Sequence, residues 1–179
     1  MKPIFIFNPN AANGKLKRKI NYVLKVIKQY INDFNYIISN NEDEIDKYLN
    51  LIDQHDTIIG VGGDGTINAI INHSLCLSNK TYGIIPFGSG NDLIYTLKIP
   101  KNIDKSIQVI KNNKFSYIDI GKIKTEKFNK FFLNAAGIGF DAMVANKTNN
   151  IKIIDGQLKY YLSLIYCLFK YISLNKYKY

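Results

Sequence analysis

Short apolar runs alternate with amphipathic stretches over residues 1–114 of the chain. The apolar runs predict four strands that are buried on both faces, at residues 3–7, 35–39, 56–61 and 81–86. Between and after them, apolar residues recur at helical spacing, which predicts helices at 16–30, 42–51, 66–75, 91–97 and 102–112. Buried strands that alternate with helices are typical of an α/β fold with a parallel sheet.

The pattern changes after about residue 114. Residues 114–124 and 129–145 are strand-like segments with no long helix between them, and residues 118–120 are expected to pair with residues 131–133 as antiparallel strands. One helix is then predicted at about 156–173. Its wide apolar stripe is more typical of packing in a core than of insertion into a membrane.

These patterns predict two domains. Residues 1–114 are expected to form an α/β domain, and residues 115–179 are expected to form part of a second, β-rich domain with one helix. No internal repeat and no low-complexity linker interrupts the chain.

The charge of the chain is lopsided. It has 179 residues and carries 24 Lys and Arg against 14 Asp and Glu, which gives a net charge of +10. A basic excess favours anionic partners such as nucleotides, nucleic acid or an acidic lipid surface. However, Lys, Asn, Ile and Tyr are enriched together along the whole chain, and the longest basic block, at 15–19, is short. We therefore attribute the charge to a composition bias and expect no nucleic-acid partner.

Cysteine and histidine usage excludes two classes of site. Cys76 and Cys167 lie far apart without a CxxC motif, and His55 and His73 are isolated, which argues against a zinc site and a disulfide scaffold. Unpaired cysteines fit a reducing compartment. The longest apolar stretch, at 160–169, is too short to span a membrane, and the N-terminus lacks a signal-peptide pattern. We expect a cytoplasmic protein, soluble or peripheral at the membrane, with no transmembrane segment.

Glycines cluster around one acid directly after the third predicted strand, in the sequence GVGGDG at 60–65. Ligands of α/β sheets bind beyond the carboxyl ends of the strands, where glycines let backbone N–H groups approach phosphate oxygens. The dinucleotide fingerprint is disfavoured, because the loop follows the third strand and residues 80–90 contain no acid to hold a ribose. Residues 13–16 contain Gly-Lys but lack the rest of a P-loop. A plain tight turn remains an alternative.

Two more loops rich in glycine and asparagine are expected at the same edge of the sheet. Residues 8–15 follow the first predicted strand, and residues 86–92 follow the fourth. The carboxyl ends of parallel strands meet at one edge, so the three loops are expected to converge there. Such convergence favours a nucleotide site over three separate turns.

Five motifs together resemble the diacylglycerol kinase catalytic-domain family, which includes bacterial lipid kinases and sphingosine kinases. The motifs are NP (8–9), GGDGTIN (62–68), PFGSGND (86–92), DIG (119–121) and FLNAAGIGFDA (132–142). GGDGT alone is shared with NAD kinases, whereas its combination with GSGND and GIGFDA is specific. The resemblance implies a Rossmann-like parallel α/β nucleotide domain, followed here by the start of an incomplete β-sandwich domain.

The resemblance also implies roles for individual residues. Its ATP-binding set comprises Asn8, Gly62, Gly63, Asp64, Gly65, Thr66, Gly88, Ser89, Gly90 and Asn91. Asp64, Asp92 and Asp119 match acids associated with Mg²⁺, and Asp141 matches a position that meets the lipid headgroup. Asp64 is also the candidate catalytic carboxylate, which would orient or deprotonate the attacking hydroxyl. Each acid keeps a structural alternative: a loop or metal-relay role for Asp64, an N-cap for Asp92, and ordinary structural acids at Asp119 and Asp141.

The function implied is an ATP-dependent lipid kinase that transfers the γ-phosphate to the hydroxyl of a diacylglycerol-like or sphingoid lipid at a membrane surface. Three positions depart from the family pattern: Ala69, Ser89 and Tyr95. Family members are longer, so we expect a fragment or shortened homologue with weak or no activity by itself. The alternatives are an inactive nucleotide-binding fragment, an NAD kinase and a membrane-surface module. Whether the chain forms a homo-oligomer is left open.

Overall fold

The computed structural model describes residues 2–74, 79–88, 90–151 and 157–175. The chain divides into two compact units, Met1–Leu133 (unit 1) and Asn134–Tyr179 (unit 2), and each is described by itself. The domain boundary expected after residue 114 stays a prediction.

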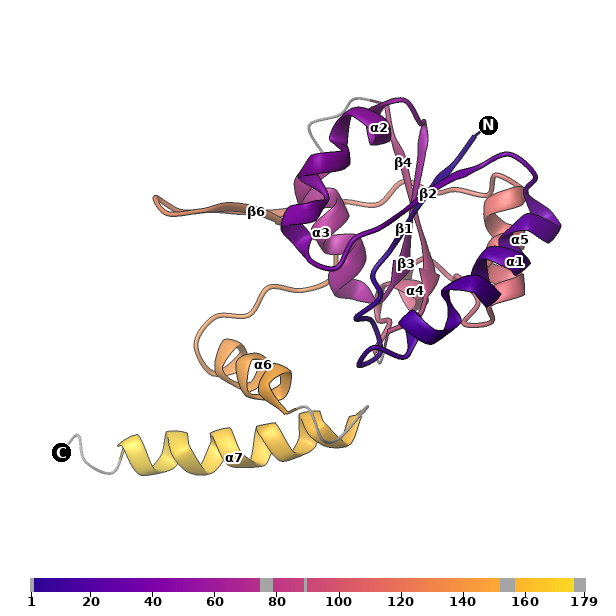
Figure 1. The fold of residues 1–179 in the computed structure, drawn as a ribbon. Helices are drawn as coiled ribbons and strands as arrows, with labels where there is room; N and C mark the ends of the chain where they lie inside the picture. Colours follow the sequence, from indigo (N-terminus) through magenta and orange to yellow (C-terminus); the bar gives the residue numbers. More distant parts are fainter. Residues whose placement is uncertain (1, 75–78, 89, 152–156, 176–179) are drawn as a thin grey trace. The chain divides into compact units, whose positions relative to one another are not determined.

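A four-stranded parallel sheet forms the centre of unit 1 (Figure 1). Its strands are β1 (Ile4–Phe7), β2 (Asn35–Ile38), β3 (Thr57–Gly62) and β4 (Thr81–Pro86), in the order β2-β1-β3-β4. Ile4 is aligned with Asn35 of β2 and with Ile58 of β3. The parallel α/β fold predicted from the apolar runs is confirmed.

Helices cover both faces of this sheet (Figure 1). On one face lie α1 (Ile20–Tyr30), which follows a 3-10 turn at Leu16–Lys19, and α5 (Ile103–Lys111); on the other lie α2 (Leu49–Asp53) and α3 (Asp64–Ser74). Successive side chains of a strand point to opposite faces. Accordingly, Phe5 and Phe7 of β1 pack in one apolar cluster with α1 and α5, while Ile4 and Ile6 pack in another with α2 and α3.

The helix predicted at 42–51 is wrong over most of its length. Two 3-10 turns, Glu42–Glu44 and Asp46–Tyr48, precede the short α2. Asn41 Oδ1 accepts from the backbone N–H of Glu44, and the Glu44 carboxylate accepts from the N–H of Asn40. Such local bonds between side chains and the backbone compete with regular helical bonding.

A two-stranded antiparallel sheet, β5 (Gly121–Lys124) with β6 (Asn129–Phe132), begins after α4 (Leu93–Thr96) and α5. The register places Phe131 opposite Lys122, so the expected partner at 118–120 is wrong. The turn explains the difference. The N–H of Thr125 donates to the Phe128 carbonyl, and the Thr125 hydroxyl accepts from the N–H of Phe128. Turn geometry of this kind fixes the register of a hairpin.

The described part of unit 2 contains two helices, α6 (Phe140–Asn150) and α7 (Gln157–Asn175), which pack against each other. The long helix predicted at 156–173 is confirmed, whereas the strand predicted at 129–145 is formed only over Asn129–Phe132 and is wrong beyond that residue. Phe140, Met143 and Val144 have the spacing of a helix face, and Val144 is buried.

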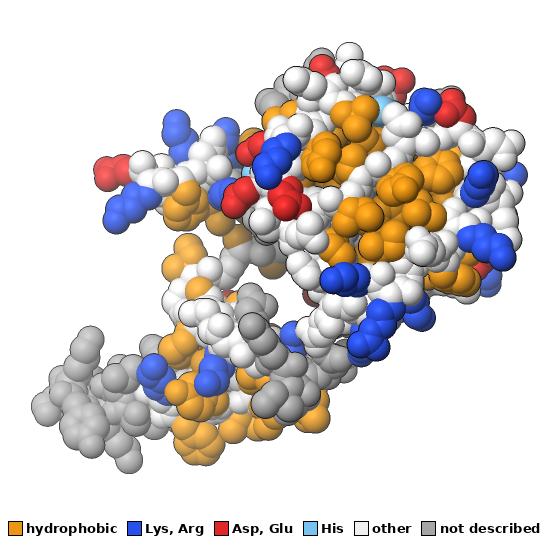
Figure 2. Space-filling model, viewed as in Figure 1, with side chains coloured by type: hydrophobic (Ala, Val, Ile, Leu, Met, Phe, Trp, Pro, Cys, Tyr) orange, Lys and Arg blue, Asp and Glu red, His pale blue; other side chains and the backbone are white. Residues whose placement is uncertain are grey.

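Two surface properties bear on partners. On the face of unit 1 that Figure 2 shows, Lys and Arg side chains are scattered and do not merge into one continuous basic area. Among the described helices, none combines the length and the hydropathy needed to cross a membrane.

Candidate functional site

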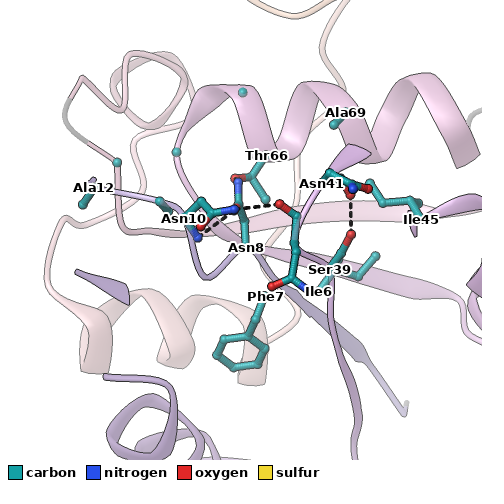
Figure 3. A pocket seen from close by; sticks show the side chains of 15 residues that line it. Ile6, Phe7, Asn8, Asn10, Ala12, Ser39, Asn41, Ile45, Thr66 and Ala69 are labelled. Atoms are coloured by element: carbon teal, nitrogen blue, oxygen red, sulfur yellow. Dashed lines mark hydrogen bonds between the residues drawn. The ribbon is translucent and has the colours of Figure 1, made fainter. Parts of the chain in front are cut away.

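A cavity of about 420 Å³ lies at the carboxyl end of the unit 1 sheet (Figure 3). Its lining comes from the segments that follow β1 and β2, from the first turns of α3 and from the loop after β4. Its polar and glycine lining residues are Asn8, Asn10, Ser39, Asn40, Asn41, Gly63, Gly65, Thr66 and Gly88, and its apolar ones are Ile6, Phe7, Ala11, Ala12, Ile45 and Ala69. The sheet edge predicted to hold a nucleotide therefore carries a real cavity.

The loop after β1 is tied to the first turn of α3. The side-chain N–H of Asn8 donates to the Thr66 hydroxyl over 3.1 Å, and the two side chains point toward each other in Figure 3. Asn8 Oδ1 in turn accepts from the backbone N–H of Asn10. Both ends of the Asn8 amide are thus engaged, which fixes its orientation at the cavity wall.

The segment after β2 was not predicted as part of the site. Ser39, Asn40 and Asn41 line the cavity, and Asn10 donates from Nδ2 to the Asn40 carbonyl over 2.7 Å. The sequence does carry a signal for them, because a polar run follows the strand predicted at 35–39. The rule that identified the other strand-end loops applies here as well.

Two glycines bring the loops after β3 and β4 into direct backbone contact. A Cβ on Gly63 would lie 2.9 Å from the Cα of Gly88, and a Cβ on Gly88 would lie 2.5 Å from the Cα of Gly63. Asn91 fixes the second loop, since its Oδ1 accepts from the N–H of Gly88 and its Nδ2 donates to the Gly88 carbonyl. These residues are explained by packing inside the protein.

Gly65 has no such explanation. It is the second residue of α3 and lines the cavity, and a Cβ at this position would meet no other atom within 4 Å. In a helix glycine is less favourable than alanine by about 1 kcal/mol. A helix N-terminus presents free N–H groups and the positive end of the helix dipole. The open space beside Gly65 is therefore suited to the close approach of an anionic ligand.

Asp64 and Asp92 come together beside this turn. The Asp64 carboxylate accepts from the backbone N–H groups of Asp92 and Leu93, at 3.0 and 2.9 Å. Asp92 occupies the N-cap position of α4, but its own side chain makes no cap hydrogen bond. A Cβ on Gly90 would lie 3.6 Å from both Asp64 Oδ2 and Asp92 Oδ1. The carboxylates of Asp64 and Asp92 thus both lie beside the position that a Cβ on Gly90 would occupy. Hard oxygen donors of this kind suit Mg²⁺.

The remaining expected site residues are placed differently. Asp119 is exposed in an irregular segment, and no three acidic, His or Cys side chains of the described chain gather as a metal-binding group. Asp141 is exposed in the first turn of α6, in unit 2. Ser89 lies outside the described residues. The structure therefore brings together two of the three expected metal-binding acids.

The cavity wall is largely apolar and carries no charged side chain among its described residues. Its described lining residues include no Lys, Arg, Asp or Glu, and its polar groups are side-chain amides, hydroxyls and the backbone. An anion bound here would be held by backbone N–H groups and by the N-terminus of α3.

A parallel α/β unit with a cavity at the strand ends and at a helix N-terminus is typical of nucleotide-binding domains. Comparison with known proteins identifies the family. Residues 2–123 match the diacylglycerol kinase catalytic domain, and the chain belongs to that family. The resemblance carried by the five motifs is confirmed.

Individual relatives agree. The chain is 32% identical over 161 residues to a diacylglycerol kinase of Staphylococcus saprophyticus, covering 88% of this chain and 52% of the relative. It is 38% identical over 112 residues to a diacylglycerol kinase of Bacillus subtilis, covering 61% and 36%. The solved structure of a diacylglycerol kinase from Bacillus anthracis superimposes with a TM-score of 0.57 at 28% identity, covering 66% of this chain and 44% of that one. The chain thus spans about half the length, or less, of these relatives.

Proposed function

We propose that unit 1 binds ATP with Mg²⁺ in the cavity and that the protein is a lipid kinase, which transfers the γ-phosphate of ATP to a lipid hydroxyl. The observation that carries the proposal is the open space beside Gly65, at the N-terminus of α3 and within the cavity. A helix N-terminus with a glycine in its first turn is suited to phosphate. Membership of the diacylglycerol kinase family supports the same ligand.

The proposed nucleotide contacts fall into two groups. Backbone N–H groups of the glycine loop, at Gly63 and Gly65, would face the phosphates. The Thr66 N–H is donated to the Gly63 carbonyl, so Thr66 would contribute through its hydroxyl, beside the Asn8 amide that is bonded to it. Gly62, Gly88, Ser89, Gly90 and Asn91 complete the proposed ATP-binding set. Asn91 acts through the backbone of Gly88, because its amide is engaged there.

Mg²⁺ is proposed to bind beside Asp64 and Asp92, with Asp119 as a third proposed acid. The ion would neutralise charge on the transferring phosphate, which is a large part of phosphoryl-transfer catalysis. The two carboxylates lie beside the position that a Cβ on Gly90 would occupy, and Mg²⁺ commonly takes one or two carboxylates and keeps several waters.

Asp64 is proposed as the catalytic carboxylate. Each of its oxygens accepts one backbone N–H, which orients the group. A carboxylate oxygen has two lone-pair sites, and we propose that Asp64 accepts the hydrogen bond of a substrate hydroxyl in addition to these N–H bonds. The same capping bonds favour the alternative that the chain binds nucleotide without transferring phosphate, with Asp64 as a structural residue.

The proposed acceptor is a diacylglycerol-like or sphingoid lipid, with Asp141 at its headgroup. The names of the relatives support diacylglycerol as the first lipid to test. Such a substrate would require the protein to act at a membrane surface.

The test is a transfer assay with γ-labelled ATP, Mg²⁺ and detergent-dispersed diacylglycerol or sphingosine. The proposal predicts label in the lipid product, and no label with Asp64→Asn. Binding of ATP without any labelled lipid would instead support the nucleotide-binding alternative. In a parallel reaction with NAD in place of the lipid, label transferred to NAD would show an NAD kinase and contradict the proposal.

A further inference from the structure

Polar side chains recur every four residues along one face of α3, at Asp64, Asn68 and Asn72. Residues at this spacing lie above one another on a helix surface. Asp64, at the N-terminal end, holds the start of α4. Asn72, two turns later, holds β6.

Asn72 binds β6 in the manner of a neighbouring strand. Its Oδ1 accepts from the backbone N–H of Phe131, and its Nδ2 donates to the Phe131 carbonyl, both over 2.9 Å. The second proton of Nδ2 is directed to the carbonyl of Asn68, also over 2.9 Å. The Asn72 amide therefore makes three hydrogen bonds, and together they fix its orientation. Asparagine is a poor residue for a helix interior, so its presence here calls for a reason.

The same helix connects the cavity to this contact. Gly65 and Thr66, in the first turn of α3, line the cavity, and the helix continues without interruption to Ser74. Ile67 and Ile71 of α3 pack in one apolar cluster that Phe131 and Leu133 join. Leu133 is the last residue of unit 1, so β6 determines where the chain leaves that unit.

We propose that Asn72 is a positioning residue that links occupancy of the nucleotide cavity to the order of β6. A ligand that fixes the N-terminus of α3 restrains the helix, and Asn72 passes that restraint to the backbone of Phe131. The proposal rests on the proposed function, because it needs a nucleotide at the α3 N-terminus. If Asn72 had only a structural role, it would hold β6 equally well with the cavity empty or filled.

Linkage gives the proposal a quantitative form. If the nucleotide suppresses opening of β6 by some factor, then the open form binds nucleotide more weakly by the same factor. Allosteric couplings commonly start at about fivefold. Loss of the Asn72 contact should therefore abolish the nucleotide effect on β6 and weaken nucleotide binding by the same factor.

The experiment measures amide hydrogen exchange over residues 129–133, with and without Mg²⁺ and adenylyl imidodiphosphate, and the dissociation constant of this ATP analogue by calorimetry. In the natural chain the analogue should slow exchange at least about fivefold. In Asn72→Ala the slowing should vanish and the dissociation constant should rise by the matching factor. Asn68→Ala, one turn away on the same helix, is the control and should retain both, because Asn72 contacts only its backbone carbonyl.

Three outcomes would overturn the proposal. These are nucleotide binding without slowed exchange in the natural chain, slowing that persists in Asn72→Ala, and an unchanged dissociation constant in that variant. Asn72→Asp, which keeps an acceptor for the N–H of Phe131 but loses the donor, serves if the alanine variant does not fold. A natural chain that binds no nucleotide would overturn the proposed function, and this proposal with it.

Discussion

Replacing Gly65 by alanine tests whether this glycine is needed for folding or for binding a ligand. The substitution adds a methyl group to the first turn of α3, where no atom other than those of the neighbouring residues and the helix's own backbone lies within 4 Å of the new Cβ. A Gly→Ala change at a compatible position stabilises a protein by about 0.4–1 kcal/mol. For a chain of this size, that corresponds to a rise in Tm of about 1–4 °C.

The same methyl group would occupy the space through which phosphates are proposed to approach the backbone. We expect Gly65→Ala to weaken binding of Mg²⁺-ATP at least about tenfold, a loss of about 1.4 kcal/mol. Thermal unfolding followed by circular dichroism measures the first effect, and calorimetric titration with Mg²⁺-ATP measures the second. The expected signature is a more stable protein that binds its ligand less well.

Gly63→Ala is the matched control. Its Cβ would lie 2.9 Å from the Cα of Gly88, so this change should destabilise the fold by about 1–3 kcal/mol through overpacking. If Gly65→Ala kept full affinity for ATP, the assignment of the phosphates to the α3 N-terminus would be wrong. If Gly65→Ala lowered the Tm, the claim that a methyl group fits at this position without a clash would be wrong.

Three further substitutions follow from the site. Asp64→Asn should lower stability by about 1–2 kcal/mol, because the amide has one acceptor oxygen for the two N–H groups of Asp92 and Leu93, and it should abolish any phosphate transfer; unchanged unfolding in urea would contradict the capping role. Asp92→Asn, whose side chain makes no cap bond, should leave stability within about 0.5 kcal/mol while reducing the Mg²⁺ dependence of ATP binding; an unaltered Mg²⁺ titration would refute its metal role. Thr66→Val removes the acceptor of the Asn8 amide and should cost about 1–3 kcal/mol in thermal unfolding; a neutral result would show that this hydrogen bond contributes nothing.

The parallel sheet could be predicted because its strands carry their own signal. β1 and β3 are buried along their whole length, so each appears in the sequence as a continuous apolar run. The helices α1 and α5 of unit 1 also carry their own signal, because their apolar residues recur at helical spacing on one face.

Two helical regions were mispredicted because a weak local pattern was outweighed. The segment at 42–51 has apolar residues at helical spacing, but bonds between the Asn41 and Glu44 side chains and the backbone break it into short turns. α6 was missed because its apolar face is short and follows a glycine-rich stretch. The spacing of Phe140, Met143 and Val144 was the available clue.

The sequence predicted where the site lies, but not the side-chain contacts within it. The strand-end rule located the loops after β1, β3 and β4 and would have located the loop after β2. The cap that Asp64 provides to Leu93 joins residues 29 positions apart, and the bond between Asn72 and Phe131 joins residues 59 positions apart. Such pairs depend on how elements pack, and a single sequence contains no direct signal for them.

Calorimetric titration of the purified natural chain with Mg²⁺-ATP tests the central claim most directly. We expect one saturable site with a dissociation constant of about 1 mM or tighter, as is usual for enzymes and their substrates. We also expect that the heat of binding falls away in Gly65→Ala, which should fold at least as well. A folded natural chain that gives no heat of binding with Mg²⁺-ATP would contradict the account.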